Sequence, residues 1–219
     1  MGFREVLSYC STWIVIVPLI VGVTLYGCLK GNSKLILLLI VFASIPQIMF
    51  ALVWEQNSEI NLVYNIYTLI EFILLMLFFY RLRIFDRAKF FSIFSVFVFI
   101  SAVAYLVLIY GFRTFFLSRL VFLSNFIYTG WILFYLYTII KEDAVFSFKS
   151  SQTWYLTAYL LYSPCTALVF LFWNQRNNGI PILKDIGFVQ SFFNIILYVF
   201  IATGFIVDYT KNKKCQEMT

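Results

Sequence analysis

The charged residues of this chain are gathered into clusters that are separated by long uncharged runs. Asp, Glu, Lys and Arg are absent from 6–29, 35–54, 90–112, 120–140, 150–175 and 186–207, and Glu71 alone interrupts a seventh run at 60–80. A helix needs about 20 apolar residues to cross roughly 30 Å of hydrocarbon. Backbone amides in lipid must also hydrogen-bond within their own segment. The pattern therefore predicts seven membrane-crossing helices.

The composition agrees with a membrane location and excludes several other classes of protein. Of 219 residues, 63% are hydrophobic and only 12% are charged, whereas a typical soluble domain is about half apolar and a quarter charged. So few charges cannot cover the surface of a soluble domain of this length. The chain is therefore neither a soluble enzyme nor a disordered segment.

The predicted fold class is all-α, with residues 1–219 forming a single integral membrane bundle. The expected spans are roughly 12–29, 35–54, 61–81, 90–110, 119–140, 153–173 and 186–208. The loops between them are too short to hold a folded domain. Any function is therefore expected inside the bundle, at its ends or through a partner.

The basic residues predict which way the bundle faces. One side receives Lys30, Lys34, Arg81, Arg83, Arg87, Lys89, Lys141, Lys149, Lys211, Lys213 and Lys214, and the other receives Arg4, Arg113, Arg119, Arg176 and Lys184. Lys and Arg are in excess in cytoplasmic loops, so the N-terminus is predicted outside and the C-terminus in the cytoplasm. Asp208, Glu142 and Asp143 are expected to be solvated charges at the cytoplasmic edge.

The net charge of +6 follows from this asymmetry. It indicates contact with lipid headgroups, and nucleic acid is not expected as a partner. The bundle is predicted to lie in a plasma membrane or a bacterial inner membrane.

Several residue types that carry chemistry are missing. The chain has no histidine, and its four cysteines have no C-x-x-C spacing. His-ligated metals, the commonest general base and a thiolate metal site are therefore not expected. We predict no metal and no cofactor, and the single intramembrane carboxyl group weighs against an enzyme.

Glu71 is the only Asp, Glu, Lys or Arg side chain that is predicted to lie in the hydrocarbon, away from the ends of a span. It lies ten residues from both Asn61 and Arg81, which places it about 15 Å from either end of a helix. A charge at that depth costs on the order of 2.5 kcal/mol or more, so such residues normally face the bundle interior and mark a function. The alternative is a protonated Glu71 that serves only as a structural hydrogen-bonding group.

The helix that carries Glu71 has a polar face in its outer half. At 100° per residue, one arc of roughly 120° contains Asn61, Tyr64, Asn65, Thr68 and Glu71. The same face becomes apolar toward the predicted cytoplasmic side, at Leu75 and Phe79. Glu71 is therefore expected at the inner limit of a polar stripe.

Other predicted helices carry polar residues in the same half of the bundle. These residues are Asn125, Tyr128 and Thr129 in the fifth span, Gln190 and Asn194 in the seventh, Ser44 and Gln47 in the second, and Thr166 in the sixth, where it is the outer member of a stripe that also contains Tyr155, Tyr159 and Tyr162. If these faces converge, they form a polar pocket that opens outward, with Glu71 at its floor. Alternatively, the amides and hydroxyls only hold helices together, and the tyrosine stripe is core.

Three functions remain compatible with this pattern. The first is a receptor-like or sensor-like protein that binds a small ligand or lipid and signals through a cytoplasmic or membrane partner. The second is a small secondary transporter in which Glu71 is the proton or cation site. The third is a non-catalytic accessory subunit of another membrane protein. The candidate ligand or proton site comprises Glu71, Thr68, Asn65, Tyr64, Asn61, Asn125, Tyr128, Gln190 and Asn194.

Overall fold

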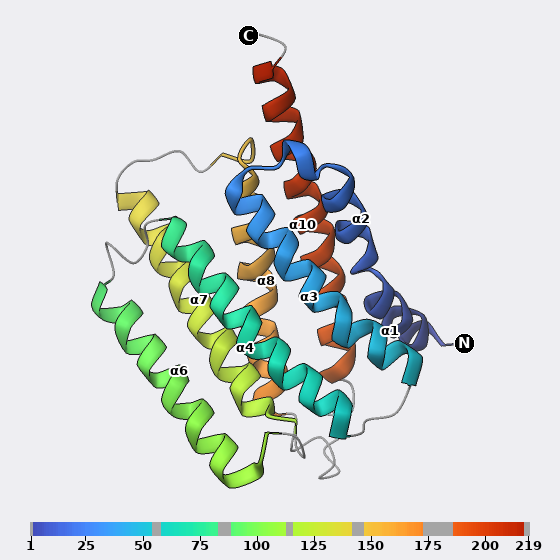
Figure 1. Ribbon diagram of the computed structural model, residues 1–219, viewed down its shortest axis with the longest axis vertical. Helices are drawn as coiled ribbons and strands as arrows, with labels where there is room; N and C mark the ends of the chain where they lie inside the picture. The colour runs from blue at the N-terminus through green and yellow to red at the C-terminus, as the bar shows by residue number, and fades with distance from the viewer. Residues whose placement is uncertain are drawn as a thin grey trace.

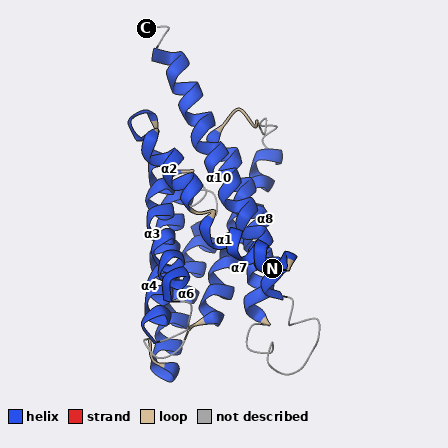
Figure 2. Ribbon diagram, turned by 90° about the vertical axis from the view of Figure 1, so that its right-hand side faces the viewer, coloured by secondary structure: helices blue, strands red, loops and turns tan. Residues whose placement is uncertain are grey.

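The protein is helical throughout the part that its computed structural model describes, which comprises residues 2–53, 58–82, 89–112, 116–141, 147–172 and 186–216. The elements are α1 (Phe3–Trp13), α2 (Ile16–Thr24), the 3₁₀ helix η1 (Tyr26–Cys28), α3 (Gly31–Val53), α4 (Ser58–Arg81), α6 (Lys89–Tyr110), α7 (Ser118–Lys141), α8 (Ser151–Leu171) and α10 (Ile186–Gln216). Figure 2 shows helices and no strand within these ranges.

Seven helical segments are long and apolar enough to cross a membrane, which confirms the predicted number. They are Arg4–Thr24, Gly31–Leu52, Glu59–Arg81, Lys89–Tyr110, Ser118–Lys141, Ser151–Leu171 and Gly187–Lys213. Five of them agree with the predicted spans to within a few residues. The last helix differs, because α10 continues to Gln216 and so passes well beyond the predicted end at 208.

The first span also differs from the prediction of one helix over 12–29. It begins at Phe3, is interrupted after Trp13, and resumes at Ile16 as α2. Pro18 accounts for the interruption, because proline has no N–H to donate to the carbonyl four residues earlier. That carbonyl belongs to Ile14, and it accepts the Val17 N–H instead, at 3.0 Å.

The long helices run side by side and alternate in direction. α8 packs against both α7 and α10, and α3 packs against α4. Figure 1 shows α6 at one edge of the bundle and the α1–α2 segment at the other. We call the end where α3 and α8 begin and α10 finishes the C-terminal end, and the other end, where α7 and α10 begin, the opposite end.

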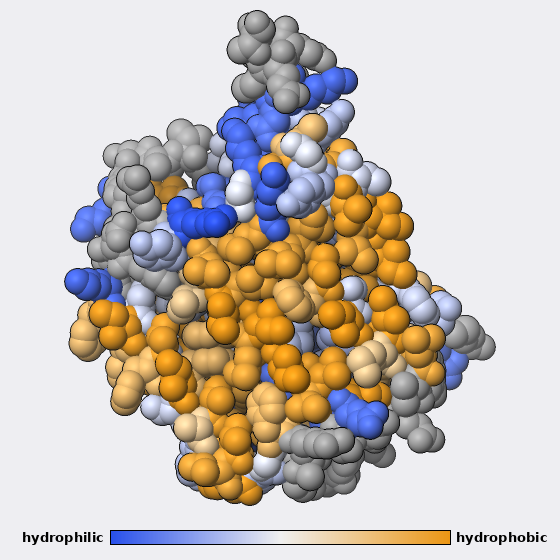
Figure 3. Space-filling view, viewed as in Figure 1, coloured by the Kyte–Doolittle hydropathy of each residue, from blue (hydrophilic) through white to orange (hydrophobic). Residues whose placement is uncertain are grey.

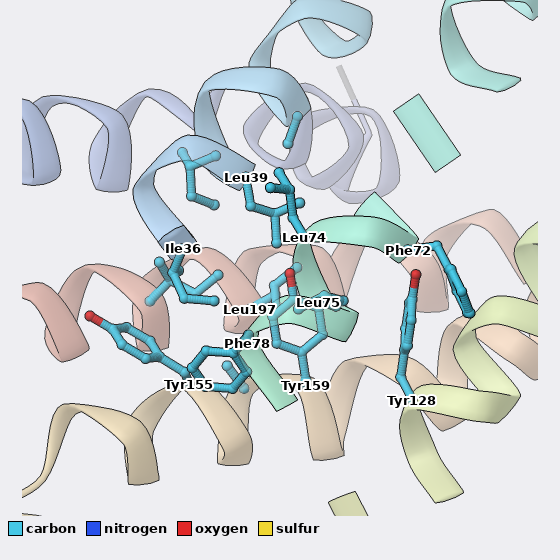
Figure 4. Close-up of a cluster of buried hydrophobic side chains, with 14 of the residues drawn as sticks. Ile36, Leu39, Phe72, Leu74, Leu75, Phe78, Tyr128, Tyr155, Tyr159 and Leu197 are labelled. Carbon is cyan, nitrogen blue, oxygen red and sulfur yellow. The ribbon is translucent and has the colours of Figure 1, made fainter. Parts of the chain in front are cut away.

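The core is built largely from aromatic side chains that meet between these helices. The rings of Phe72 and Phe99 stack with centroids 3.6 Å apart, which joins α4 to α6. Trp131 of α7 is fully buried and packs edge-on against Phe79, 5.2 Å away. In Figure 4, Tyr155 and Tyr159 extend from α8 among aliphatic side chains of α3 and α4. Of the two alternatives for the tyrosine stripe, these two tyrosines therefore follow the second and belong to the core.

The outer surface is apolar, as lipid contact requires. Large exposed hydrophobic side chains are numerous along α6, where Phe90 and Leu108 are each 85% exposed. Figure 3 shows apolar residues over most of the visible face and hydrophilic residues gathered toward the C-terminal end. This distribution fits a multi-pass membrane protein.

Asp208 is not the solvated edge charge that the sequence suggests. Its side chain is only 4% exposed. It accepts the Lys30 N–H at 2.8 Å, directly before α3, and the Ser151 hydroxyl at 3.4 Å, at the start of α8. A carboxylate is stabilised beside helix N-termini, so Asp208 ties the beginnings of two helices to α10. Glu142 and Asp143 lie outside the described residues.

Candidate functional site

A cavity of about 270 Å³ lies inside the bundle and is lined by residues of six helices. Its wall consists of Ser8, Ser11, Thr12, Ala43, Pro46, Gln47, Phe50, Tyr64, Tyr67, Thr68, Glu71, Phe116, Val121, Asn125, Tyr162, Phe170, Gln190, Ser191, Asn194, Leu197 and Tyr198. We call it the central cavity. The polar faces of α4, α7 and α10 therefore meet at one space.

Glu71 is the acidic residue of the central cavity. Its side chain is 6% exposed, and its Oε1 accepts a hydrogen bond from the Tyr67 hydroxyl at 3.1 Å. Tyr67 lies one helical turn earlier on α4, so the two groups share a side of the helix. Apolar core residues Leu75 and Phe79 follow on the same face and are fully buried or nearly so. Glu71 therefore marks the limit of the polar stripe toward the C-terminal end of the bundle.

Carboxamide groups connect the helices around the cavity. Gln47 of α3 donates to the Tyr198 hydroxyl of α10 at 2.6 Å, and Gln190 of α10 donates to the Tyr162 hydroxyl of α8 at 3.1 Å. Asn194 donates to the backbone oxygen and hydroxyl of Ser11 in α1, at 3.2 and 3.1 Å. These bonds hold α1, α3 and α8 to α10.

Three carboxamide oxygens of the wall residues accept no hydrogen bond from the described part of the chain. Gln47 Oε1, Asn125 Oδ1 and Gln190 Oε1 are buried without a hydrogen-bond partner within the described part of the chain. The orientation of Asn125 is fixed, because its Nδ2 donates to the Val121 carbonyl at 2.9 Å and a carbonyl can only accept. An unpaired buried acceptor costs about 1–3 kcal/mol. A hydrogen-bond donor placed against any of these three oxygens would therefore be stabilising.

Six of the nine predicted site residues line the central cavity: Tyr64, Thr68, Glu71, Asn125, Gln190 and Asn194. The structure does not place Asn61, Asn65 or Tyr128 on this wall. Asn61 lies near the start of α4 and is partly exposed.

Asn65 and Tyr128 have other surroundings. Asn65 is 1% exposed; it donates to the Phe112 carbonyl at 2.8 Å and accepts the Leu117 N–H at 3.0 Å. It therefore holds the end of α6 to the start of α7. Tyr128 is fully buried, with ring centroids about 6 Å from those of Phe72 and Trp131. Both residues contribute to packing rather than to the cavity wall.

The sequence reasoning missed part of the wall. Tyr67 lies 40° beyond Glu71 on the helical projection and so just outside the predicted arc; its i, i+4 spacing from Glu71 was the available signal. Three further wall residues, Ser8, Ser11 and Thr12 of α1, lie before or at the predicted start of the first span near residue 12. Their i, i+3, i+4 spacing is that of one helix face.

The described residues contain no cluster of three or more His, Cys, Asp or Glu side chains that could hold a metal ion. A second hollow, of about 490 Å³, lies at the C-terminal end and is lined by Lys30, Arg81, Lys211 and Asp208 among others. Charged groups at helix ends are expected where a bundle meets lipid headgroups. The central cavity is therefore the better candidate for a specific site.

The fold defines the class of protein: an all-helical bundle whose seven long apolar helices fit a multi-pass membrane protein, with a polar cavity at its centre. Comparison with protein-family models, with curated proteins and with solved structures yields no match. The function is therefore argued from the cavity itself.

Proposed function

We propose that this protein binds a small molecule or lipid in the central cavity and acts as a receptor-like or sensor-like membrane protein. The observation that carries the proposal is a cavity between six helices, with a largely apolar wall that also contains carboxamide groups and the carboxyl group of Glu71. Ligand sites are typically concave, largely apolar and provided with a few convergent polar groups. The central cavity has each of these properties.

Interhelical hydrogen bonding accounts for some of these polar residues but not for all of them. It explains the Gln47–Tyr198 and Gln190–Tyr162 pairs. It explains neither a cavity of about 270 Å³ nor the unpaired oxygens in its wall, because a void loses packing contacts and an unpaired buried acceptor costs free energy. A bound molecule that donates hydrogen bonds accounts for both.

The proposed topology places the N-terminus outside and the C-terminus in the cytoplasm of a plasma or bacterial inner membrane. The cavity extends from Glu71 toward the opposite end, where Phe116 and Phe170 lie. In this topology a ligand would enter from the outer leaflet or the outside solution. In this proposal the signal passes to a cytoplasmic or membrane partner protein.

A transporter is the second candidate, and the position of Glu71 favours it. A single acid near the middle of a bundle is a common proton or cation site. Uptake of a candidate solute into liposomes, driven by a pH gradient and lost in Glu71→Gln, would favour transport over reception. Solute that binds but never crosses the bilayer would favour the receptor.

Native mass spectrometry tests the proposed binding. The protein in lipid nanodiscs is equilibrated with an extract of cellular small molecules and lipids, and the mass of any bound molecule is measured. Ser191→Phe places a ring at the cavity wall, whereas Val199→Phe adds the same ring to a half-exposed position on the same helix. We expect Ser191→Phe to lose the bound mass and Val199→Phe to retain it. An empty wild type, or equal occupancy in both variants, would overturn the proposal.

A further inference from the structure

We propose that the ligand of the central cavity is a small organic amine, with a protonated amino group bound near Glu71 and a compact apolar body. This inference rests on the proposed ligand-binding function and specifies the chemistry of the ligand. It is argued from the charge of the wall, its hydrogen-bonding capacity, its aromatic surface and its size.

The charge of the wall selects against an anion. Glu71 is the one Asp or Glu among the described lining residues, and none of them is Lys or Arg. The chain contains no histidine at all. A ligand carboxylate or phosphate would therefore meet an acid without a compensating cation. A protonated amine would instead give the buried carboxyl group the opposite charge that such groups require in a low-dielectric interior.

The hydrogen-bonding capacity of the wall selects for a donor. Asn125 is 1% exposed, its Nδ2 donates one hydrogen bond to the Val121 carbonyl, and its Oδ1 is buried without a partner. Gln47 and Gln190 also have unpaired oxygens. An ammonium group has three N–H donors and no acceptor. It therefore complements a wall that contains a carboxyl group and unpaired carboxamide oxygens.

The remaining surface suits the apolar part of an organic cation. Seven lining residues are aromatic: Phe50, Tyr64, Tyr67, Phe116, Tyr162, Phe170 and Tyr198. Phe116 contacts Tyr64 and Phe170 edge-to-face, with ring centroids 5.9 and 5.6 Å apart. Aromatic faces attract cations and also pack against hydrocarbon. A bare metal ion would have no apolar part to pack against these aromatic side chains.

The size of the cavity limits the body of the ligand. Its volume of about 270 Å³ lies just below the roughly 300–1,000 Å³ that is usual for drug-sized ligands. The space is far larger than a metal ion requires and too small for a whole phospholipid. An arylalkylamine of the size of 2-phenylethylamine fits this range.

Calorimetry with three matched probes tests the proposal. The protein in nanodiscs is titrated with 2-phenylethylamine, with the uncharged 2-phenylethanol and with the anionic 3-phenylpropionate, and heats from empty nanodiscs are subtracted. We expect the amine to bind at least about tenfold more tightly than the alcohol, as one buried charge pair can provide. We expect no measurable binding of the acid.

Substitution of Glu71 tests whether its carboxyl group is responsible for the preference for the amine over the alcohol. Glu71→Gln should weaken amine binding about tenfold or more, and it should leave the affinity for 2-phenylethanol within about twofold, which also shows that the cavity is intact. Glu59→Gln removes the same charge from an exposed position on the same helix and should change neither affinity.

The outcomes separate this inference from the proposed function. If the alcohol binds as tightly as the amine, if the acid binds best, or if Glu71→Gln leaves amine binding unchanged, the amine class is overturned and the cavity remains a ligand site. If none of the three probes binds the wild type, the amine class is overturned as well. The proposed function is tested separately by native mass spectrometry, where an empty wild type, or equal occupancy in Ser191→Phe and Val199→Phe, would overturn it.

Discussion

Single polar residues inside this bundle have two distinct uses, and α4 carries both. Tyr64 and Asn65 are adjacent in sequence and lie on the same predicted arc. Tyr64 lines the central cavity, whereas Asn65 is bonded to backbone groups on either side of the connection between α6 and α7. The first residue is placed to meet a ligand, and the second positions a loop.

Asn65→Ala should therefore destabilise the protein rather than alter its ligand preference. The substitution leaves the Phe112 carbonyl and the Leu117 N–H without their side-chain partner, and we expect a loss of about 2 kcal/mol in the free energy of unfolding. Thermal unfolding in detergent gives the stability. Asn32→Ala, at a partly exposed amide, is the control and should change it little. Equal melting temperatures for the two variants would contradict the role assigned to Asn65.

Helical spacing in the sequence groups polar residues of the cavity wall, but it does not separate them from neighbours with other contacts. Helical spacing was sufficient to group Tyr64, Thr68 and Glu71, because all three project from one side of α4. It could not separate Asn65 from them, since the partners of Asn65 are backbone atoms from a distant connection. Asp208 was misjudged for the same reason: its partners belong to Lys30 and Ser151, far away in sequence.

At the scale of elements, hydropathy located the helices, and side-chain volume determines how closely they pack. Gly204 of α10 faces the ring of Tyr155 of α8, and a Cβ atom added at Gly204 would collide with that ring. Tyr155 is itself fully buried and donates to the Ser33 hydroxyl at 2.9 Å, which reaches α3. One glycine thus permits a contact that involves three helices.

Gly204→Ala and Gly187→Ala should change stability in opposite directions. Both replace a glycine in α10 by a better helix former, which by itself gains up to about 1 kcal/mol. At Gly187 a Cβ would meet nothing within 4 Å, so the gain should be retained. At Gly204 the collision with Tyr155 should cost about 1–3 kcal/mol. Unfolding of both variants in one detergent tests this, and stabilisation by Gly204→Ala would rule out the close packing.

The beginning of the first span shows where hydropathy alone was insufficient. Residues Phe3–Trp13 contain Arg4, Glu5 and several polar residues, so they score poorly as part of a membrane helix. The structure nevertheless places α1 in the bundle, where Ser11 meets Asn194 of α10. The contact depends on tertiary packing, which no local pattern in the first twelve residues specifies.

At the scale of the whole molecule, the distribution of basic residues predicts one orientation. Cysteine labelling tests it with a membrane-impermeant maleimide in a cysteine-free background. Gly2→Cys should react in intact cells, because the N-terminus is expected outside. Lys213→Cys should react only after the cells are permeabilised. The reverse labelling pattern would contradict the predicted orientation, and it would mean that the central cavity faces the cytoplasm.

The last helix offers a practical consequence for imaging a chain of only 219 residues. α10 continues without interruption from Ile186 to Gln216, and Figure 1 shows its final turns projecting past the other helices. A soluble helical protein joined in register to these turns would be held rigidly by one shared helix. Such a chimera would provide the alignment marker that cryo-electron microscopy needs for so small a particle, and it would leave the cavity untouched at the far half of the bundle.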